Sequence, residues 1–223
     1  MKAMILAAGR GERLRPYTDS TPKPLLKAGN FLLIEYIIQA LAKAGITEII
    51  INIAHLADQF PATLGNGQQY GVNITYSPEQ DGALETAGGI INALPLLGEE
   101  PFLIVNGDVW TDYNYQDLVQ KPLSTGSLCH LVLINNPAHN PQGDFVLTSG
   151  LIKSEGDVKY TYSGIGIYHP TLFSDLSVQR LALKPILLKA ISEEQISGEL
   201  YKGEWSDIGT IERLERLAAK LTA

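Results

Sequence analysis

A run of glycines and basic residues near the N-terminus has the composition of a phosphate-binding loop. Gly9 and Gly11 directly follow an apolar run, Arg13 comes two residues later, and Lys23 lies between two prolines further on. Small residues let backbone N–H groups approach a phosphate closely, and Arg and Lys side chains are strong donors to its oxygens. We therefore expect a phosphate-bearing ligand to contact the backbone of Ala8, Gly9, Gly11 and Glu12 and the side chains of Arg13 and Lys23.

Two common glycine motifs can be tested against this loop, and both fail. A dinucleotide-binding fingerprint needs a third glycine at position 14, where Leu14 stands. A P-loop needs Gly-Lys-Ser/Thr after four spacer residues, and the sequence has none here. A bare Gly-x-Gly would indicate only a tight turn with solvated cations, so the prediction depends on the spaced basic residues.

Two aspartates stand where a divalent cation could be bound. Asp108 ends the apolar run 102–106 within Asn106-Gly107-Asp108, and Asp207 lies in the turn Trp205-Ser206-Asp207-Ile208-Gly209. Phosphoryl-type chemistry uses Mg²⁺, which prefers one or two carboxylates together with substrate oxygens. From position alone, Asp108 is equally compatible with a loop-end turn residue, and Asp207 is more typical of a helix cap.

The segments that must position these residues alternate between strand-like and helical patterns. Continuously apolar runs, typical of strands buried on both faces, alternate with stretches of helical spacing that end at Gly45 and Pro95. This rhythm predicts an α/β fold, a Rossmann-like three-layer sandwich with a mostly parallel central sheet. The expected strands are 3–8, 48–53, 72–76 and 102–106, and the expected helices are 31–44, 56–64 and 86–94.

The second half of the chain has a different residue pattern. Strand-like stretches dominate it, and no linker rich in Pro, Gly or Ser separates it from the first half. We expect a single domain over 1–223, divided into halves 1–125 and 126–223, the second of which adds a small mixed β extension that resembles a lid. The expected strands are 127–134, 145–148, 151–153, 160–168 and 196–201, and the expected helices are 184–192 and 210–221.

Composition and charge narrow the functional classes. The formal charge of −7 argues against a nucleic-acid partner, yet residues 1–27 carry six basic and two acidic side chains, which suits a small anionic ligand. The single Cys129 excludes an internal disulfide, and no run approaches the roughly 20 apolar residues of a membrane span. We expect a soluble, cytoplasmic protein with no membrane partner; the sequence indicates no oligomeric state.

The full spaced set, Gly9-x-Gly11-x-Arg13 followed by Pro22-Lys23, resembles the signature of the sugar-1-phosphate nucleotidyltransferase family. The resemblance covers essentially the whole chain. It implies a nucleotide-binding half at 1–125 and a sugar-binding half at 126–223, and transfer of a nucleotidyl group from a nucleoside triphosphate to a sugar 1-phosphate. It also implies that Arg13, Lys23 and Asp108 are catalytic, and that Asp108 and Asp207 bind Mg²⁺.

The family resemblance also implies how the base is read. Its members use a residue at the end of the third strand and a backbone amide five positions later, a separation that Gln80 and Glu85 have here. The Gln80 amide suits the N–H and carbonyl of uracil or thymine, whereas a carboxylate suits guanine. Glu79 is adjacent, so a shift of one residue would reverse the inference. Glycine commonly stands at position 85 in the family, and we expect Glu85 to have a negative φ and to point away from the base.

The sugar-phosphate site is implied by weaker similarities. Asn106, Gly143 and Ser163 lie in segments that resemble those contacting the sugar in the family. The family's usual Glu-Lys-Pro is absent, and Lys153-Ser154-Glu155-Gly156-Asp157-Val158-Lys159 stands instead. We expect Glu155 to bind a sugar hydroxyl or amide, and Lys153 or Lys159 to reach the phosphate, although each is equally compatible with a solvated surface charge.

These features together favour one branch of the family. The short length, the motifs 84–89 and 105–108 and the missing Glu-Lys-Pro resemble the branch that acts on N-acetylmuramate 1-phosphate in peptidoglycan recycling. This implies transfer of UMP from UTP, giving a UDP-sugar and pyrophosphate. The alternatives are a glucose-1-phosphate thymidylyl- or uridylyltransferase and a mannose-1-phosphate guanylyltransferase. A catalytically silent sugar-nucleotide sensor is an alternative from another class, against which the intact Arg13, Lys23, Asp108 and Asp207 argue.

Overall fold

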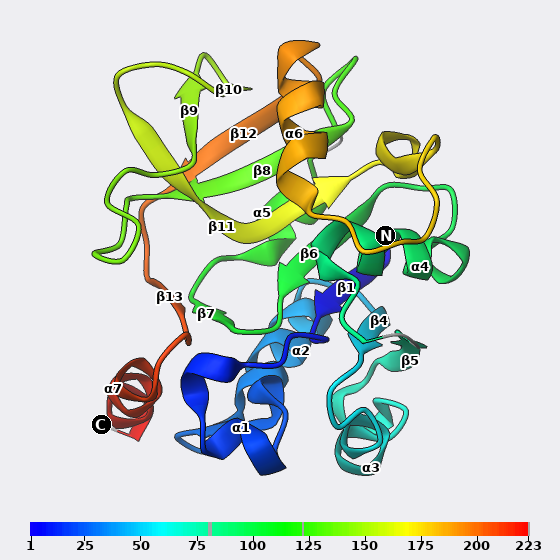
Figure 1. Ribbon diagram of the computed structural model, residues 1–223, viewed down its shortest axis with the longest axis vertical. Coiled ribbons are helices and arrows are strands. Elements are labelled where there is room, and N and C mark those ends of the chain that lie inside the picture. The colour runs from blue at the N-terminus through cyan, green and yellow to red at the C-terminus, as the bar shows by residue number, and fades with distance from the viewer. Residues whose placement is uncertain (80–81, 122, 223) are drawn as a thin grey trace.

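A single nine-stranded sheet runs through the protein (Figure 1). The computed structural model describes residues 1–79, 82–121 and 123–222. The strand order is β5-β4-β1-β6-β11-β8-β12-β10-β9, so strands from both halves of the chain belong to one sheet. The seam between the halves is the antiparallel pair of β6 (Phe102–Asn106) with β11 (Lys159–Tyr168).

Four neighbouring strands from the first half are parallel. They are β5 (Asn73–Pro78), β4 (Glu48–Ile53), β1 (Ala3–Leu6) and β6, and their register aligns Leu6 of β1 with Asn52 and Asn106. Because parallel strands end at the same edge, the loops that follow β1 and β6 are brought together there. Gly107 permits close approach, since a Cβ on it would lie 2.7 Å from the Leu6 carbonyl oxygen.

The second half extends the sheet in mixed orientation. β11 is antiparallel to β8 (Cys129–Ile134), and the register shifts between Tyr162 and Ile165. β12 (Ile196–Tyr201) is parallel to β8, and the short strands β9 (Phe145–Thr148) and β10 (Leu151–Lys153) form the far edge. The expected α/β fold with a β extension is confirmed.

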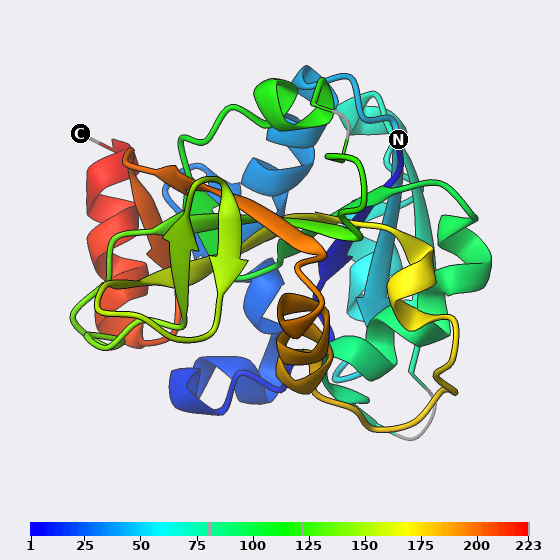
Figure 2. The ribbon, with the colours of Figure 1, turned by 90° about the horizontal axis from the view of Figure 1, so that it is seen from above.

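Helices cover both faces of the sheet, as the view from above shows (Figure 2). Alternate side chains of β1 point to opposite faces of the sheet: Ala3 and Ile5 pack in one core cluster, and Met4 packs in the other. One face carries α2 (Leu33–Lys43), α3 (Gln59–Leu64) and α5 (Tyr115–Val119). The opposite face carries α4 (Glu85–Leu97) and α6 (Leu183–Ser192).

A third, smaller core joins the two ends of the chain. Leu14, Leu26 and Leu33 from the N-terminal segment pack with Ile208 and with Leu217 of α7 (Ile211–Thr222). The ribbon of β7 (Val109–Thr111) and β13 (Trp205–Asp207) leads into α7. This packing holds the C-terminal turn, residues 205–209, beside the loop that contains Gly9, Gly11 and Arg13, which we call the glycine-arginine loop. The remaining short elements are η1 (Glu12–Leu14), α1 (Tyr17–Ser20), η2 (Lys23–Leu25), β2 (Lys27–Ala28), β3 (Phe31–Leu32), η3 (Gln68–Tyr70) and η4 (Pro170–Phe173).

One helix boundary differs from the prediction. The expected helix ends before Pro95, whereas α4 continues through Pro95 to Leu97. Proline lacks an N–H and cannot donate to the preceding turn, which is costly mid-helix. Here it stands in the last turn, and the N–H of Gly98 still donates to the Leu94 carbonyl at 2.9 Å. The prediction was wrong because a proline so near the end removes only one helical hydrogen bond.

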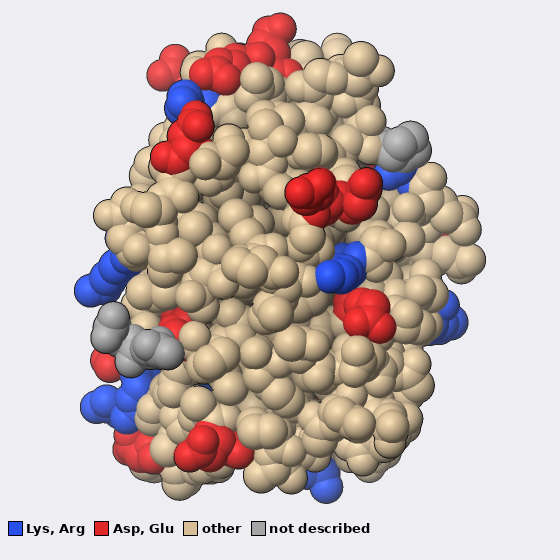
Figure 3. All heavy atoms as spheres, turned by 90° about the vertical axis from the view of Figure 1, so that its right-hand side faces the viewer, with Lys and Arg blue, Asp and Glu red and all other residues tan. Residues whose placement is uncertain are grey.

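The face on the right of Figure 1 shows scattered charges (Figure 3). Lys and Arg side chains stand singly among Asp and Glu side chains, and uncharged residues cover most of that view. Among the described residues, no helix has both the length and the apolar character needed to cross a bilayer.

Candidate active site

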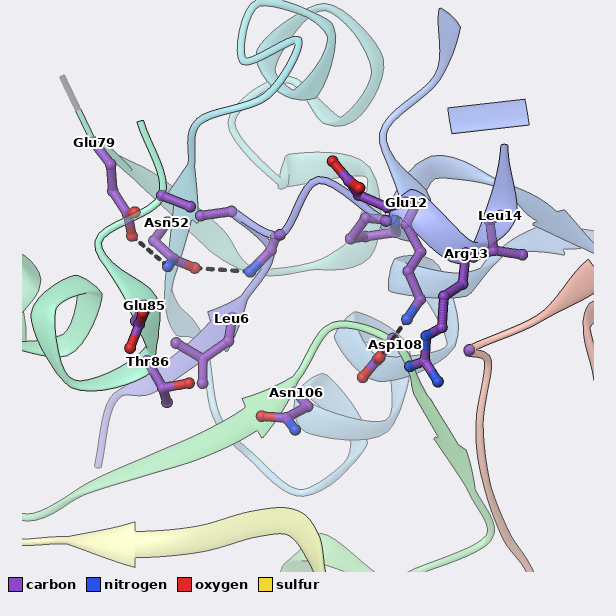
Figure 4. A pocket seen from close by; sticks show the side chains of 18 residues that line it. Leu6, Glu12, Arg13, Leu14, Asn52, Glu79, Glu85, Thr86, Asn106 and Asp108 are labelled. Atoms are coloured by element: carbon purple, nitrogen blue, oxygen red, sulfur yellow. Dashed lines mark hydrogen bonds and ion pairs between the residues drawn. The ribbon is translucent and has the colours of Figure 1, made fainter. Parts of the chain in front are cut away.

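A cavity of about 400 Å³ opens where the parallel strands end (Figure 4). Arg13 and Asp108 line one end of it, and Asn52, Glu79, Glu85 and Thr86 line the other. Lys23 lines the cavity beside Asp108, with which it pairs. Leu6 and Asn106 lie between the two ends. Of the other predicted residues, the cavity wall includes Ala8, Gly9, Gly11 and Glu12.

The glycine-arginine loop is closed by Thr18. Gly11 has φ 68°, and a Cβ on it would lie 2.9 Å from Cγ2 of the buried Thr18, so a glycine is required. The Thr18 hydroxyl donates to the Gly11 carbonyl at 2.9 Å. Arg10 turns away from the cavity, donates to the Thr18 carbonyl at 2.6 Å and lies against His55. Arg10 therefore stabilises the loop, whereas Arg13 lines the cavity.

Lys23 and Asp108 form an ion pair at the end of the cavity that we predict to bind phosphate. The Lys23 side chain is 12% exposed and belongs to η2, whereas Asp108 follows β6. Arg13 comes from η1, and among the described residues it has no hydrogen-bond or ion-pair partner. The structure therefore gathers the three residues that the sequence predicted to be catalytic.

The opposite end of the cavity is braced by a buried carboxylate. Asn52 accepts from the Ala7 N–H and donates to Glu79, and the other Glu79 oxygen accepts from the Leu84 N–H, each at 2.7 Å. Asn52 and Glu79 are both buried. A Cβ on Gly89 would lie 2.5 Å from a Glu79 oxygen, so α4 needs a glycine to make room. The brace ties together the ends of β1, β4 and β5.

This brace bears on the base-reading prediction. Gln80 lies outside the described residues, so its role stays a prediction. Glu79, the competing candidate, already accepts one hydrogen bond on each oxygen from the protein itself. A carboxylate held in this way serves first as a structural acceptor.

Glu85 differs from the prediction. It has φ 61°, not the expected negative value, and so takes the left-handed conformation that glycine adopts without strain. Three backbone hydrogen bonds join the turn to Leu181: its N–H donates to the Leu84 carbonyl at 2.9 Å, and its carbonyl accepts from Ala87 at 3.0 Å and from Gly88 at 3.1 Å. The Glu85 carboxylate pairs with Arg180 at 2.9 Å, and the residue also lines the cavity. The flanking hydrogen bonds offset the strain that a side chain brings there.

Asp207 is placed differently from Asp108. Its carboxylate pairs with Arg213 and lies 3.1 Å from Nε2 of His139, along a second cavity of about 640 Å³. The two aspartate segments are nevertheless adjacent, since the Ile208 N–H donates to the Asp108 carbonyl at 2.8 Å. No cluster of three or more His, Cys, Asp or Glu side chains suited to a metal occurs in the described part of the chain.

The predicted sugar-phosphate residues are dispersed. Asn106 lines the cavity and packs on Gly164. The Ser163 hydroxyl is buried and donates to the Val132 carbonyl at 2.7 Å, and the Gly143 N–H donates to Asn140 at 3.2 Å. Glu155 is exposed in the loop between β10 and β11. Lys153 pairs with Glu194 at 2.6 Å, and Lys159 is half-buried in β11.

Some cavity residues escaped the sequence analysis. Asn52 was the detectable one, because a polar residue among the isoleucines of the strand Glu48–Ile53 signals a buried hydrogen-bond role. Thr86 and Gly209 gave no such signal. The remaining unpredicted members of the wall are Leu6, Ala7, Leu14, Pro24 and Ala83.

Comparison with known proteins agrees with this geometry. A relative 49% identical over 98% of this chain and 97% of its own length is N-acetylmuramate alpha-1-phosphate uridylyltransferase of Neisseria meningitidis serogroup B. Another, 32% identical, is mannose-1-phosphate guanyltransferase of Debaryomyces hansenii, and that match covers 94% of this chain and 61% of the relative.

Solved structures share the fold. A Bacillus anthracis protein crystallised with sucrose superposes with a TM-score of 0.88 at 24% identity, covering 100% of this chain and 95% of that one. The inositol-1-phosphate CTP transferase of T. maritima gives 0.79 at 18% identity, covering 99% and 95%. The model of the nucleotidyl transferase family matches residues 2–223. Sequence and fold together show that the chain belongs to the nucleotidyl transferase family.

Proposed function

We propose that the protein transfers UMP from UTP to N-acetylmuramate 1-phosphate, giving the UDP-sugar and pyrophosphate. The observation that carries the proposal is the meeting of Arg13, Lys23 and Asp108 at the carboxyl ends of the parallel strands. The 49% identity to an N-acetylmuramate alpha-1-phosphate uridylyltransferase supports the choice of substrates. The reaction would belong to peptidoglycan recycling, in the cytoplasm, where nucleoside triphosphates are available.

The main obstacle to this reaction is electrostatic, since both substrates are multiply anionic. Two unit charges 4 Å apart interact by about 4 kcal/mol at an effective dielectric near 20. Arg13 would hold the β- and γ-phosphates, and Lys23 the charge near the α-phosphorus, while the amides of Gly9, Gly11 and Glu12 bind phosphate oxygens. An oxygen of the sugar 1-phosphate then attacks the α-phosphorus in line, and the bond to pyrophosphate breaks without a covalent enzyme intermediate.

The donor set suits Mg²⁺. Two carboxylates on adjoining segments, Asp108 and Asp207, are ligands of the kind that this ion prefers. When bound, Mg²⁺ neutralises phosphate charge and polarises the transferring group. Lys23 and Arg213 now pair with these carboxylates, so each carboxylate would exchange an ammonium or guanidinium partner for the ion.

The preference for a pyrimidine base rests on the brace. Each Glu79 oxygen already accepts one hydrogen bond, from Asn52 and from Leu84, so the protein fixes this carboxylate and leaves only one further acceptor site on each oxygen for the two adjacent N–H groups of guanine. We keep Gln80 and the amide of Glu85 as the proposed readers of uracil.

The acceptor site is proposed to lie beside Asn106. Gly143 and Glu155 stay proposed sugar contacts, and reaching the cavity would require their segments to exchange hydrogen bonds. Ser163 stays a proposed contact through its main chain, because its hydroxyl donates to the Val132 carbonyl. We also propose that residues 1–223 act as one domain, with the nucleotide bound by 1–125 and the sugar by 126–223.

The test is pyrophosphate release from a matrix of UTP, dTTP, GTP, CTP and ATP against several sugar 1-phosphates, N-acetylmuramate 1-phosphate among them. We expect the highest kcat/KM for UTP with N-acetylmuramate 1-phosphate. A preference for mannose 1-phosphate with GTP would replace the proposal by a guanylyltransferase. Turnover with no pair, together with retained UTP binding, would point to a sensor.

A further inference from the structure

Gly209 lies between two guanidinium groups. A Cβ placed on it would come 2.8 Å from Nη2 of Arg213 and 3.0 Å from Nη2 of Arg13. Both nitrogens therefore approach the same point, although like charges repel at short range. In the described part of the chain, the acidic partner of Arg213 is Asp207, bound through Nη1, and Arg13 has none. Two convergent cations need an anion between or beside them.

The fold holds Arg213 in this position. Its side chain is 17% exposed, and its Nη1 also donates to the Asp207 carbonyl at 3.1 Å. The Nε lies 3.4 Å from the Thr210 hydroxyl. Since Leu217 packs α7 against the N-terminal segment, the guanidinium is placed before any ligand arrives.

The position of Gly209 identifies the cavity involved. Gly209 lines the same cavity as Arg13, Lys23 and Asp108, whereas Arg213 lines the second cavity and reaches Gly209 with Nη2. The phosphate end of the active site thus extends to the first turn of α7. A ligand there must be anionic and must offer oxygens to two forked donors, as the terminal phosphates of a nucleoside triphosphate do.

We propose that Arg213 is a second pyrophosphate-binding arginine, which works with Arg13 on the β- and γ-phosphates of the triphosphate and on the released pyrophosphate. The inference rests on the proposed function and adds a residue to it. Gly209 is required because a side chain there would occupy the space between the two guanidinium groups. The carboxylate of an acceptor sugar is the competing occupant of this position.

The experiment compares equilibrium binding of pyrophosphate, UTP and UMP by calorimetry, with Mg²⁺ and again in EDTA. The variants are Arg213→Met, Arg213→Lys and Gly209→Ala. The last crowds only the flexible ends of the two arginines and leaves every charge in place. Arg216→Met is the matched control, because Arg216 lies on the same helix, is exposed and pairs with Glu212. Thermal melting verifies that each variant is folded.

We expect Arg213→Met to weaken pyrophosphate and UTP binding about tenfold or more, as for loss of a charge-assisted contact. Arg213→Lys and Gly209→Ala should give smaller losses in the same direction. UMP binding should change less than about twofold, because UMP lacks the terminal phosphates, and Arg216→Met should leave all three ligands within that range.

Three results would overturn the proposal. Equal losses for UMP and UTP would show a general effect on the site. A loss that disappears in EDTA would show that Arg213 acts only through Asp207 and the metal. An unchanged pyrophosphate affinity with a raised KM for the acceptor would assign Arg213 to the sugar. Because pyrophosphate binding needs no acceptor and no turnover, a failure of the proposed function appears separately, as UTP and UMP binding without transfer.

Discussion

The two sides of the active-site cavity are built in different ways. On the nucleotide side, parallel strands end together and hold Asn52, Glu79 and Asp108 at one edge. On the sugar side, β11 and β8 are antiparallel and their register shifts. The Ser163 hydroxyl donates to the Val132 carbonyl within this sheet, and Glu155 faces solvent. If the two sides have the roles proposed above, the difference predicts that nucleotide recognition is prebuilt, whereas acceptor recognition depends on groups that the structure does not bring together.

The largest effect should come from Asp108 on the nucleotide side. Asp108→Asn removes the charge that pairs with Lys23 and that suits Mg²⁺, so kcat should fall about a thousandfold. Asp117→Asn, an exposed acid of α5, is the control and should have no effect. The measurement is pyrophosphate release at saturating substrates, with melting curves for both variants. Activity above a tenth of the wild-type value in Asp108→Asn would contradict a catalytic role for Asp108 on the nucleotide side.

Lys23→Met should have the next largest effect. It removes a half-buried cation near the transferring phosphate, and kcat/KM for UTP should fall about a hundredfold. Lys27→Met, four residues later and exposed, keeps the local chain and should stay within about twofold of wild type. Equal losses in the two variants would mean that the region supplies general charge and no specific contact.

Glu79→Gln tests whether the nucleotide side is prebuilt. The amide offers one acceptor where the carboxylate offers two, so Asn52 or Leu84 loses its partner. The free energy of unfolding should fall by about 1–3 kcal/mol, and KM for UTP should rise by about tenfold at nearly constant kcat. Glu48→Gln, at the exposed start of the same strand as Asn52, is the control. A change of GTP over UTP preference without loss of stability would show that Glu79 reads the base.

The sequence predicted the nucleotide side better than the sugar side for a physical reason. Arg13 and Asp108 lie in the segments that follow β1 and β6, and these parallel strands end at one edge. Lys23 lies further along the chain in η2, and its role was predicted from its spacing to Arg13 and from the family resemblance. The Asn52–Glu79 contact depends on β4 and β5 being neighbours, which spacing along the chain does not reveal.

The wrong prediction for Glu85 also has a physical reason. Its left-handed turn is held by hydrogen bonds to Leu181, nearly a hundred residues away. The hydrogen bond of the Ser163 hydroxyl could not be predicted, because it accompanies a register shift in β11 that a pattern of alternating residues does not show.

A smaller effect is expected from Ser163→Ala on the sugar side. The Val132 carbonyl loses its donor, so stability should fall by about 1–2 kcal/mol while KM for the acceptor stays unchanged. Asn106→Ala is the paired variant, and it should raise the acceptor KM about tenfold with little loss of stability. Denaturant unfolding and steady-state kinetics separate the two. A raised acceptor KM in Ser163→Ala would show that the sugar side is also prebuilt.

The smallest effect concerns pH, far from the nucleotide side. The pKa of Glu199 is lowered to about 2, first by His130 and then by hydrogen bonds from Lys121 and Tyr113, against the effect of burial. Because the folded pKa lies below the ordinary 4.5, the ionised form stabilises the fold above that pH and this contribution is lost as pH falls toward 2. Glu199→Gln should therefore be less stable than wild type at pH 7. The difference in the free energy of unfolding should shrink as the pH falls from 4.5 toward 2. A constant difference in chemical denaturation across this range would contradict the pairing.

The central claim is that the nucleotide side of the cavity is built for UTP. Its most direct test is a competition in which equal concentrations of UTP and GTP meet N-acetylmuramate 1-phosphate and Mg²⁺, and the sugar nucleotides are resolved by mass. We predict that the UDP-sugar exceeds the GDP-sugar by about tenfold or more, the discrimination expected of one hydrogen-bonding contact to the base. A predominant GDP-sugar, or no sugar nucleotide at all, would contradict it.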